Sequence, residues 1–150
     1  MTDQSFAPPV SPTPASTPTP TVTDARAGFW IRFGASFVDG IIVGIPALVL
    51  EAALKGVGSG LALLLGIVYY SAFEGGETGQ TFGKRACGIR VVDASTGGPI
   101  GYARGFLRYI GRIVSSIPIF LGYFWMLWDP NKQTWHDKIA NSVVVPDDRG

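Results

Sequence analysis

The sequence has few charged residues for its size. Asp, Glu, Lys and Arg make up 15% of the 150 residues, against about 25% in an average soluble domain. Apolar residues make up 47% of the chain, and the mean hydropathy is positive, at +0.28. A small soluble domain must cover a large surface with polar side chains. This composition therefore disfavours a freely soluble globular protein and favours a small membrane protein.

Cysteine and histidine each occur once, at Cys87 and His136. A single cysteine excludes an intrachain disulfide, and the two residues together are too few for a Cys/His zinc site. The net charge of +1 creates no overall field that would attract nucleic acid. We therefore expect no metal, no cofactor and no nucleic-acid partner, and we interpret Cys87 as a small apolar residue in a reducing compartment.

Two stretches look like functional motifs but lack the residues that the chemistry needs. The segment 76–85 resembles a phosphate-binding loop, yet Thr78 stands where glycine is required and Arg85 replaces the hydroxyl that binds magnesium. His136 and Asp137 are neighbours, but no serine or cysteine nucleophile stands in a recognisable setting. We expect the first stretch to be a glycine-rich turn, the second to be a surface turn or a helix cap, and the protein not to be an enzyme.

Residues 1–26 form a Pro/Thr-rich tail with six prolines between Pro8 and Pro20. Proline fixes φ and lacks a donor, so we expect an extended, disordered segment. Its P-x-P steps make it a candidate docking site for a proline-binding domain. No basic residue precedes Arg26 and no apolar stretch begins before Phe29, so we do not expect a secretory signal.

Two apolar stretches are long enough to cross a membrane. The first, Phe29–Leu50, has 22 residues and carries Asp39 in its interior; at about 1.5 Å per residue it spans a hydrocarbon core of roughly 30 Å. The second, Val57–Phe73, has 17 residues and no charge. Because only residues 51–56 separate them, we expect an antiparallel transmembrane hairpin. Gly40 and Gly44 are expected to let its helices approach closely.

A third apolar block, Gly105–Trp128, allows two interpretations. Arg104, Arg108 and Arg112 lie at i, i+4 and i+8, so the block could be an interfacial basic helix followed by a single span. Alternatively it is a short hairpin that bends near Ser116–Pro118, dips into the membrane and returns. The second interpretation is favoured, because it keeps the C-terminal tail on the same side as the preceding loop.

The loop 74–112 predicts the topology. It contains six basic residues beside two spans, so by the positive-inside rule we expect the loop and the N-terminus to be cytoplasmic. Two β-branched runs, Gly88–Asp93 and Asn141–Pro146, are strand candidates. We expect Ile89–Val92 to pair with Val143–Val145 in a small cytoplasmic sheet. The predicted fold is thus an all-α integral membrane protein with one small β pairing, in a domain of residues 27–146 followed by a short tail, 147–150.

Charged residues within a span are the candidate functional residues. Arg32 and Asp39 are seven residues apart on one helix face, with Ser36 between them. Arg32 can reach the interface, but Asp39 must be protonated, paired or exposed to a wet cavity. Two roles remain open for Asp39. It is either an ion-pair partner of Arg108 or Arg112, or a carboxylate that binds a proton or cation.

Together these motifs resemble the RDD family of bacterial membrane proteins, named for one arginine and two aspartates. The motifs that carry the resemblance are Arg32, Asp39, residues 79–85, the strand 89–93, Arg108, residues 133–138 and residues 143–145. We assign the second aspartate to Asp137, with Asp129 as the alternative. The resemblance covers roughly residues 27–146, and the Pro/Thr-rich tail is similar to that of actinobacterial proline-rich antigens. It implies transport of a small ligand or exchange of cations for protons.

Two hypotheses follow for function. In the first, the protein is a small transporter, in which Asp39 exchanges a proton for a cation and Arg32 tunes the Asp39 carboxylate. Three or four helices are too few to enclose a transport pathway, so this hypothesis requires a homo-oligomer. In the second, the protein is a membrane scaffold that recruits partners through its tail and loop. Ser36, Arg108, Arg112 and His136 are expected to support the site in either case. A separate expectation is that the small sheet places Asp137 near the inner end of the first span, where it could meet Arg32 and hold the cytoplasmic cap.

Overall fold

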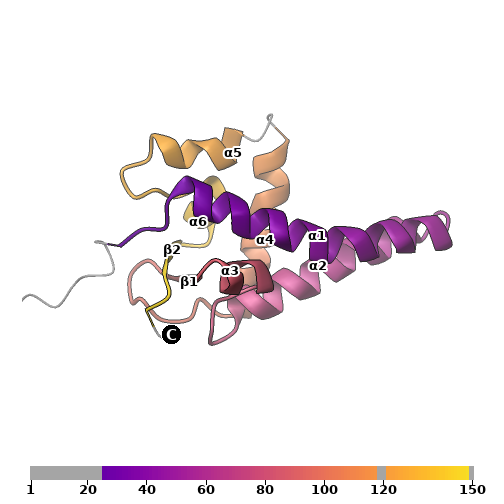
Figure 1. The fold of residues 1–150 in the computed structure, drawn as a ribbon, viewed down its shortest axis with the longest axis horizontal. Coiled ribbons are helices and arrows are strands. Elements are labelled where there is room, and N and C mark those ends of the chain that lie inside the picture. Colours follow the sequence, from indigo (N-terminus) through magenta and orange to yellow (C-terminus); the bar gives the residue numbers. More distant parts are fainter. Residues whose placement is uncertain (1–24, 118–120, 149–150) are drawn as a thin grey trace, which may run out of the picture.

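The computed structural model describes residues 25–117 and 121–148, and it is mostly helical with one small antiparallel sheet. Figure 1 shows two long helices that project from a body made of shorter helices and the sheet. The proline-rich segment, with its expected disorder and docking role, lies outside the described residues.

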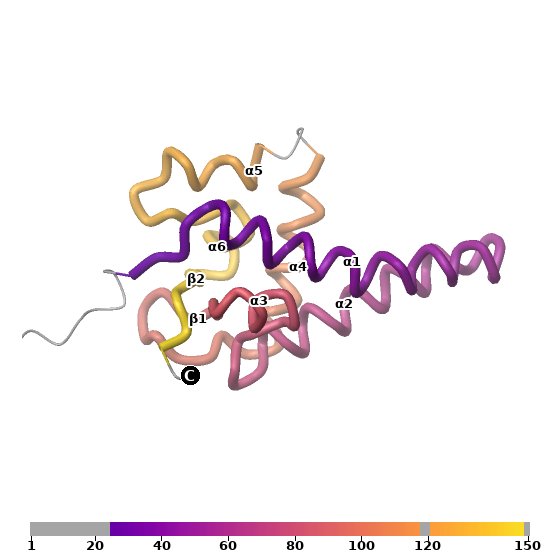
Figure 2. The backbone as a smooth tube through the Cα atoms, in the orientation of Figure 1, coloured from indigo at the N-terminus to yellow at the C-terminus, as the bar shows by residue number. Residues whose placement is uncertain are grey.

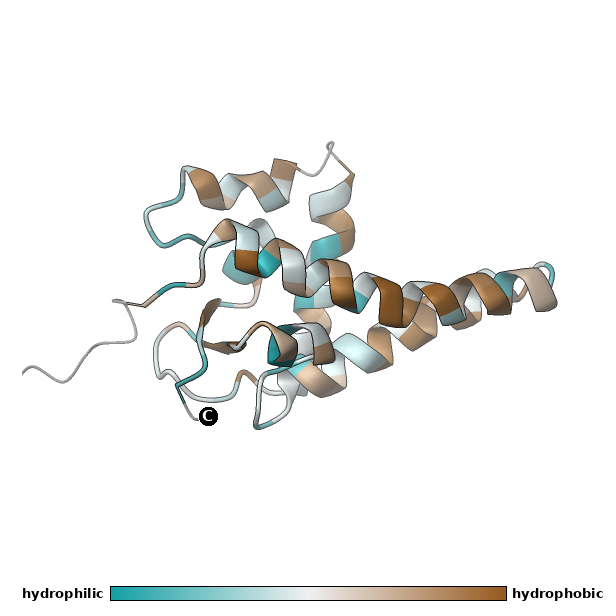
Figure 3. Ribbon diagram, in the orientation of Figure 1, coloured by the Kyte–Doolittle hydropathy of each residue, from teal (hydrophilic) through white to brown (hydrophobic). Residues whose placement is uncertain are grey.

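The two long helices are α1 (Phe29–Ala53) and α2 (Gly58–Gly75), which confirm the two predicted helical stretches. They run side by side as an antiparallel hairpin, as the backbone trace in Figure 2 shows. Within the described residues, α1 is the one unbroken helix that is long and apolar enough to cross a membrane. Apolar residues follow the projecting part of the hairpin (Figure 3), where Leu48 is 72% exposed. A face of this kind is suited to lipid rather than water.

The glycines that bring helices together are not the predicted ones. A Cβ atom added at Gly40 or Gly44 would have no described atom within 4 Å, so neither glycine is needed for packing between α1 and α2. At Gly66 of α2 a Cβ would lie 2.9 Å from Cζ of Tyr109, and at Gly58 it would lie 2.5 Å from Cα of Glu51. The close approaches therefore occur at the hairpin's turn and where α2 meets the third apolar block.

That third block contains α4 (Tyr102–Ser116), α5 (Leu121–Phe124) and the short 3-10 helix η1 (Trp125–Leu127). The axes of the two helical segments, 102–116 and 121–127, are 112° apart. The predicted bend near Ser116 is therefore present, and whether the block crosses the membrane once or dips in and returns stays a prediction. Because α4 ends at Ser116, the block has the form of a broken span or a re-entrant hairpin.

Helix α4 is amphipathic, but its polar face is buried and its apolar face is exposed. Its buried positions are Gly105, Arg108, Gly111 and Ser115. Apolar side chains such as Phe106 and Ile113 are exposed instead. A helix that turns arginine inward and isoleucine outward fits a lipid environment and a charged interior. Of the predicted basic face, Arg108 and Arg112 are directed into the protein and not toward headgroups, whereas Arg104 is partly exposed and pairs with Asp93.

The sheet closes the body at the start of α1. Strand β1 (Ile89–Asp93) follows the short helix α3 (Phe82–Ala86), and strand β2 (Ser142–Pro146) follows α6 (Trp135–Ile139). The strands are antiparallel, with Val91 opposite Val144, which confirms the predicted pairing. One face of the sheet packs against Ala35 of α1, and the backbone N–H of Ala27 donates to the carbonyl of Val144 at 2.9 Å. This packing brings α6 next to α1.

The register makes a direct prediction. Residues directly opposite in an antiparallel pair have Cα atoms about 4.5–5.5 Å apart, within reach of a disulfide. We expect Val91→Cys with Val144→Cys, in a Cys87→Ser background, to form a crosslink under mild oxidation, measured as a mobility shift on nonreducing gels. Val92→Cys with Val144→Cys is the control and should not crosslink, because neighbouring residues of a strand point to opposite faces. Equal crosslinking of both pairs would contradict the register.

Candidate functional site

Asp137 lies at the centre of the body and is fully buried. As the third residue of α6 it accepts a hydrogen bond from the backbone N–H of Thr134 at 3.0 Å, which completes a capping box with the Thr134 side chain. Its two carboxylate oxygens also pair with two guanidinium groups, Oδ2 with Arg32 and Oδ1 with Arg108. The predicted contact between Arg32 and Asp137 is confirmed. The helix-cap interpretation of this segment is also confirmed, but the surface-turn alternative is wrong because His136 and Asp137 are buried.

Glu74, at the end of α2, is the second fully buried carboxylate. It accepts from Nζ of Lys84 at 2.5 Å, from Nε of Arg108 at 2.9 Å, and from Nη2 of Arg112. Arg108 therefore bridges Glu74 and Asp137, and it also donates to Oγ of Ser142. Six residues form this ion-pair cluster, and they come from α1, α2, α3, α4 and α6: Arg32, Glu74, Lys84, Arg108, Arg112 and Asp137.

Three of the six basic residues that were counted for the topology, Lys84, Arg108 and Arg112, belong to this cluster. They are buried or nearly so, and they neutralise carboxylates inside the protein. Arg85, by contrast, is exposed. The segment 79–85, predicted as a simple turn, contains α3, with Thr81 capping its start through a hydrogen bond from Lys84 N. The helix thereby delivers Lys84 to Glu74.

Asp39 occupies a separate polar pocket at the junction of α1, α2 and α3. It is fully buried, and its carboxylate accepts from the hydroxyl of Tyr69 at 2.8 Å, the hydroxyl of Thr81 at 2.5 Å and the backbone N–H of Gly83 at 2.8 Å. Of the two roles left open for Asp39, the ion pair with Arg108 or Arg112 is wrong, because both arginines bind Glu74 instead. Neutral donors satisfy the Asp39 carboxylate and tie three helices together.

Gly83 is required at this junction. A Cβ atom added there would lie 2.8 Å from Cγ of Asp39 and would collide with the backbone carbonyl oxygen of Ala35. The absence of a side chain lets α3 approach α1 closely enough for its amide to reach Asp39.

Burial and the cluster shift several pKa values. Burial disfavours the charged form of Asp137, but Arg32 and Arg108 outweigh it and hold the pKa of this carboxyl well below its usual value. Burial lowers the pKa of Lys84 to about 8, although Glu74 acts in the opposite direction. Burial also lowers the pKa of His136 well below its usual value, opposed by Asp137 and reinforced by Arg108, Arg112 and Arg32. His136 is therefore neutral in the folded protein.

This depressed pKa predicts a pH effect on stability. The unfolded chain binds a proton at His136 below pH about 6.5, and the folded protein does not, so stability is fully present above that pH and decreases below it. We expect the free energy of unfolding in detergent to fall by roughly 1 kcal/mol per pH unit between about pH 6.5 and about pH 5. His136 is the one histidine of the chain, so His136→Gln should remove this slope. A slope that persists in the variant would refute the assignment.

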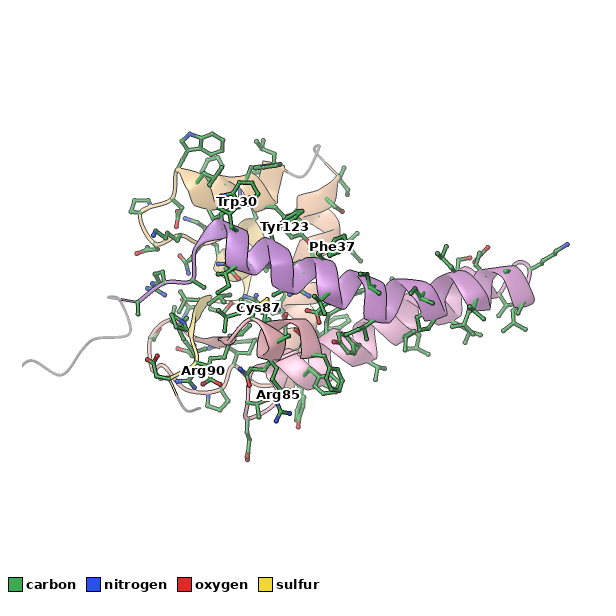
Figure 4. All side chains as sticks on the ribbon, viewed as in Figure 1. Trp30, Phe37, Arg85, Cys87, Arg90 and Tyr123 are labelled. Atoms are coloured by element: carbon green, nitrogen blue, oxygen red, sulfur yellow. The ribbon has the colours of Figure 1, made fainter. Side chains whose placement is uncertain are left out.

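A cavity of about 390 Å³ opens beside the cluster, between α1, α4, α5 and α6. Its volume lies near the lower end of the range of about 300–1,000 Å³ that is typical of small-molecule sites. Among the described residues that line it, five are basic or histidine and none is acidic: Arg32, Lys84, Arg108, Arg112 and His136. The remaining lining is mainly aromatic and apolar, with Ser36 and Thr134 as neutral polar groups. Figure 4 labels Tyr123 and Phe37, which both line the cavity.

The structure brings together most of the predicted site residues. Arg32, Ser36, Arg108, Arg112 and His136 all line the cavity, and Asp137 pairs with two of them. Arg32 and Asp39 share a helix but serve different sites, because Arg32 bonds to Asp137 and Asp39 bonds to α2 and α3. Asp129, the alternative second aspartate, pairs with Lys138 outside the cluster.

Sequence reasoning missed Glu74 and Lys84. Glu74 is the first charge after the second apolar stretch, where the sequence predicts the start of the polar loop 74–112. The available signal for a buried role was that Glu74 is the one acidic residue of α2 and lies one helical turn after Tyr70.

An exposed apolar hairpin, an inverted amphipathic helix and a buried cluster of ion pairs define a helical membrane protein with a charged interior. The chain belongs to the RDD family, whose model matches residues 26–141. The resemblance inferred from the motifs is thereby confirmed. The assignment of Arg32, Asp39 and Asp137 as the family's arginine and two aspartates stays a prediction.

Several bacterial proteins are similar to this chain. The proline-rich antigen homolog of Mycobacterium tuberculosis (strain ATCC 25618 / H37Rv) is 36% identical over 58% of this chain and 35% of its own length. The uncharacterized protein YckC of Bacillus subtilis (strain 168) is 34% identical over 79% of this chain and 83% of its own length. The uncharacterized membrane protein YteJ of the same strain is 30% identical over 83% of each chain. The match to the mycobacterial relative thus spans about a third of that protein. No solved structure matches the chain.

Proposed function

We propose that this protein is a small multi-pass membrane transporter, or the ligand-binding subunit of one, and that its ligand is an anion bound in the cavity beside the ion-pair cluster. The observation that carries the proposal is the lining of the cavity, which has Arg32, Lys84, Arg108 and Arg112 and no acidic residue among its described members. A concave site with convergent polar groups and shifted pKa values is the usual form of a binding site.

The charge balance of the cluster supports an anionic ligand. Four basic side chains face two carboxylates, Glu74 and Asp137, which leaves an excess of two positive charges. If Asp39 is counted as a third carboxylate, one positive charge is still in excess. Uncompensated buried charge is costly, and a bound anion would compensate it.

We further propose that α1 and α2 both cross the bacterial plasma membrane and that the N-terminus and the loop 74–112 are cytoplasmic. The sheet and α3 lie at the opposite end of the hairpin from its turn (Figure 2), so the turn would face outward. Exposed Arg85 lies beside the sheet and supports this orientation.

The topology is testable by labelling cysteines in intact cells with an impermeant maleimide. Lys55→Cys in a Cys87→Ser background should react from outside. Cys87 and exposed Arg85→Cys should react only after permeabilisation. Labelling at Arg85→Cys in intact cells would reverse the orientation.

We also propose a homo-oligomer, since one helical hairpin and one bent block leave much of α1 uncovered. Gly40, Gly44 and Gly60 present open backbone surface on the hairpin, which suits close helix contacts between copies. Mass measurement of the protein in nanodiscs tests this. A strictly monomeric protein with full transport activity would refute it.

Transport is tested with proteoliposomes on a solid-supported membrane, which reports charge movement when solute is added. The panel is chloride, inorganic phosphate, decanesulfonate, sodium and potassium, and we expect at least one of its anions, and neither cation, to evoke current. Arg112→Gln should abolish it and Arg85→Gln, outside the cavity, should not. Current evoked by cations alone, or an equal loss in both variants, would contradict the proposal.

The scaffold alternative rests on the proline-rich segment, which lies outside the described residues. It predicts that deletion of residues 1–24 abolishes the cellular role while the current in proteoliposomes, if any, is unchanged. The same deletion leaves function intact if the cavity is the functional site.

A further inference from the structure

Taking the proposed anion site as its basis, we infer that the ligand is amphiphilic. It carries a single carboxylate, phosphate or sulfonate head and an apolar tail, and it enters the cavity from the bilayer between α1 and α5. The cavity has a cationic end and an aromatic end, and the aromatic end borders the apolar surface of the protein.

The aromatic end is built from α1 on one side and from α5 and η1 on the other. Phe29, Phe33 and Phe37 lie at i, i+4 and i+8 and form one stripe along α1 that lines the cavity. Across from it lie Phe124 of α5 and Met126 of η1, and the rings of Phe29 and Phe124 stack with centroids 5.6 Å apart. Apolar and aromatic walls do not stabilise an inorganic anion. An alkyl or aromatic tail, by contrast, gains binding free energy when it leaves water and packs against them.

The cationic end has unused hydrogen-bonding capacity. Among the described residues, Nη1 of Arg112 and Nδ1 of His136 are buried and have no hydrogen-bond partner. Both residues line the cavity, and the Arg112 side chain is only 12% exposed. The Arg112 guanidinium is held in place by Glu74 and by the face of the Tyr70 ring, 4.2 Å from the ring centroid. A buried guanidinium with a free N–H suits the oxygen of a carboxylate or phosphate.

The aromatic end is continuous with the outer surface. Phe33, Phe37 and Phe124, which line the cavity, are themselves 56%, 62% and 43% exposed. Exposed Trp30, Leu121 and Trp125 flank them on the same two segments, and Figure 4 shows Trp30 and Phe37 along α1 on the side of α5. In a membrane this surface faces lipid. A ligand would therefore move between the apolar walls until its head reaches the cationic end, while its tail remains in the bilayer.

The test is photolabelling of the full-length protein in phosphatidylcholine nanodiscs with a diazirine-bearing analogue of decanoate, mapped by mass spectrometry. We expect the label on residues 33–37 and 123–126. Unlabelled decanoate and decyl phosphate should suppress it. Decyltrimethylammonium, which has the same tail and the opposite charge, should not, and neither should inorganic phosphate.

Two variants with matched controls probe the two ends of the cavity. Arg112→Gln should weaken labelling about tenfold or more, because it removes a charged donor, whereas Arg85→Gln should not. Ser36→Phe should block the cavity without changing any charge, and Ser59→Phe, on the distant end of α2, is its control. If Arg112→Gln does not fold, Ser36→Phe still tests the inference, because it leaves the ion-pair cluster unchanged.

If phosphatidylglycerol in the nanodisc suppresses the photolabelling, the anion comes from a membrane lipid. If the single-chain competitors suppress it and phosphatidylglycerol does not, the ligand is a free single-chain acid. Equal competition by decyltrimethylammonium or inorganic phosphate, or full labelling of Ser36→Phe, would overturn the inference. Selective labelling without any anion-evoked current would refute transport and leave the amphiphile site standing. Current evoked by inorganic phosphate without labelling would refute the amphiphile and leave transport standing.

Discussion

Asp137→Asn should lower the free energy of unfolding by about 3–5 kcal/mol, the usual cost of removing one partner from a buried ion pair. The substitution keeps the size of the side chain, so the loss is electrostatic and not a packing defect. It leaves the guanidinium groups of Arg32 and Arg108 buried near each other without the carboxylate between them. It also replaces the oxygen that accepts from Thr134 or the oxygen that accepts from Arg108 with an amide nitrogen.

The measurement is reversible unfolding in mixed detergent micelles, followed by tryptophan fluorescence. Asp148→Asn is the matched control, because Asp148 is exposed near the end of the described chain. We expect its effect to stay within about 0.5 kcal/mol, as for most surface substitutions. A similar small effect at Asp137 would mean that the ion-pair cluster does not hold the body together.

Asp39→Leu should be comparably severe. It would leave the Tyr69 hydroxyl, the Thr81 hydroxyl and the Gly83 amide buried without their acceptor. Each stranded donor costs about 1–3 kcal/mol, so the helix junction should open and the protein should lose stability by several kcal/mol. Limited proteolysis near residues 76–88 together with the unfolding measurement would detect this.

Asp39→Asn is the informative partner of that variant. Its carbonyl oxygen can still accept from Tyr69 and Gly83, and its amide can donate to Thr81 Oγ1, which also accepts from Lys84 N. We therefore expect a loss of less than about 1.5 kcal/mol, in the range of one ordinary hydrogen bond. If Asp39→Asn were as damaging as Asp39→Leu, the negative charge itself would be essential, which would favour the proton- or cation-binding role.

Much of the fold could be predicted from local patterns. The apolar stretches gave α1 and α2 because a membrane span requires length and few charges, and both properties are visible in sequence. Two β-branched runs between turns gave the pairing of β1 with β2. The contact between Arg32 and Asp137 followed from that pairing, because it brings α6 to the start of α1.

The partners of the remaining charges could not be predicted in this way. The sequence offers Arg108 and Arg112 as possible partners of Asp39, because Asp39 is the acid within a span, but α4 crosses α2 near Glu74. Which acid an arginine meets depends on where helices cross, and that is set by contacts such as Gly105 against Ser71 of α2, where a Cβ would lie 2.8 Å from a backbone oxygen. The spacing of apolar and charged residues along the sequence does not show where two helices cross. The cavity was missed for the same reason, since seven helices and strands contribute residues to it.

The most direct measurement compares two variants in the same proteoliposome preparation, on a solid-supported membrane, with decanesulfonate as the anion and sodium as the cation. We predict that Arg112→Gln loses the anion-evoked current, because Arg112 lines the cavity, and that Asp39→Asn retains it, because Asp39 holds helices together outside the cavity. The opposite pattern, a sodium-dependent proton flux that Asp39→Asn abolishes and Arg112→Gln leaves unchanged, would contradict an anion site in the cavity and assign the function to Asp39.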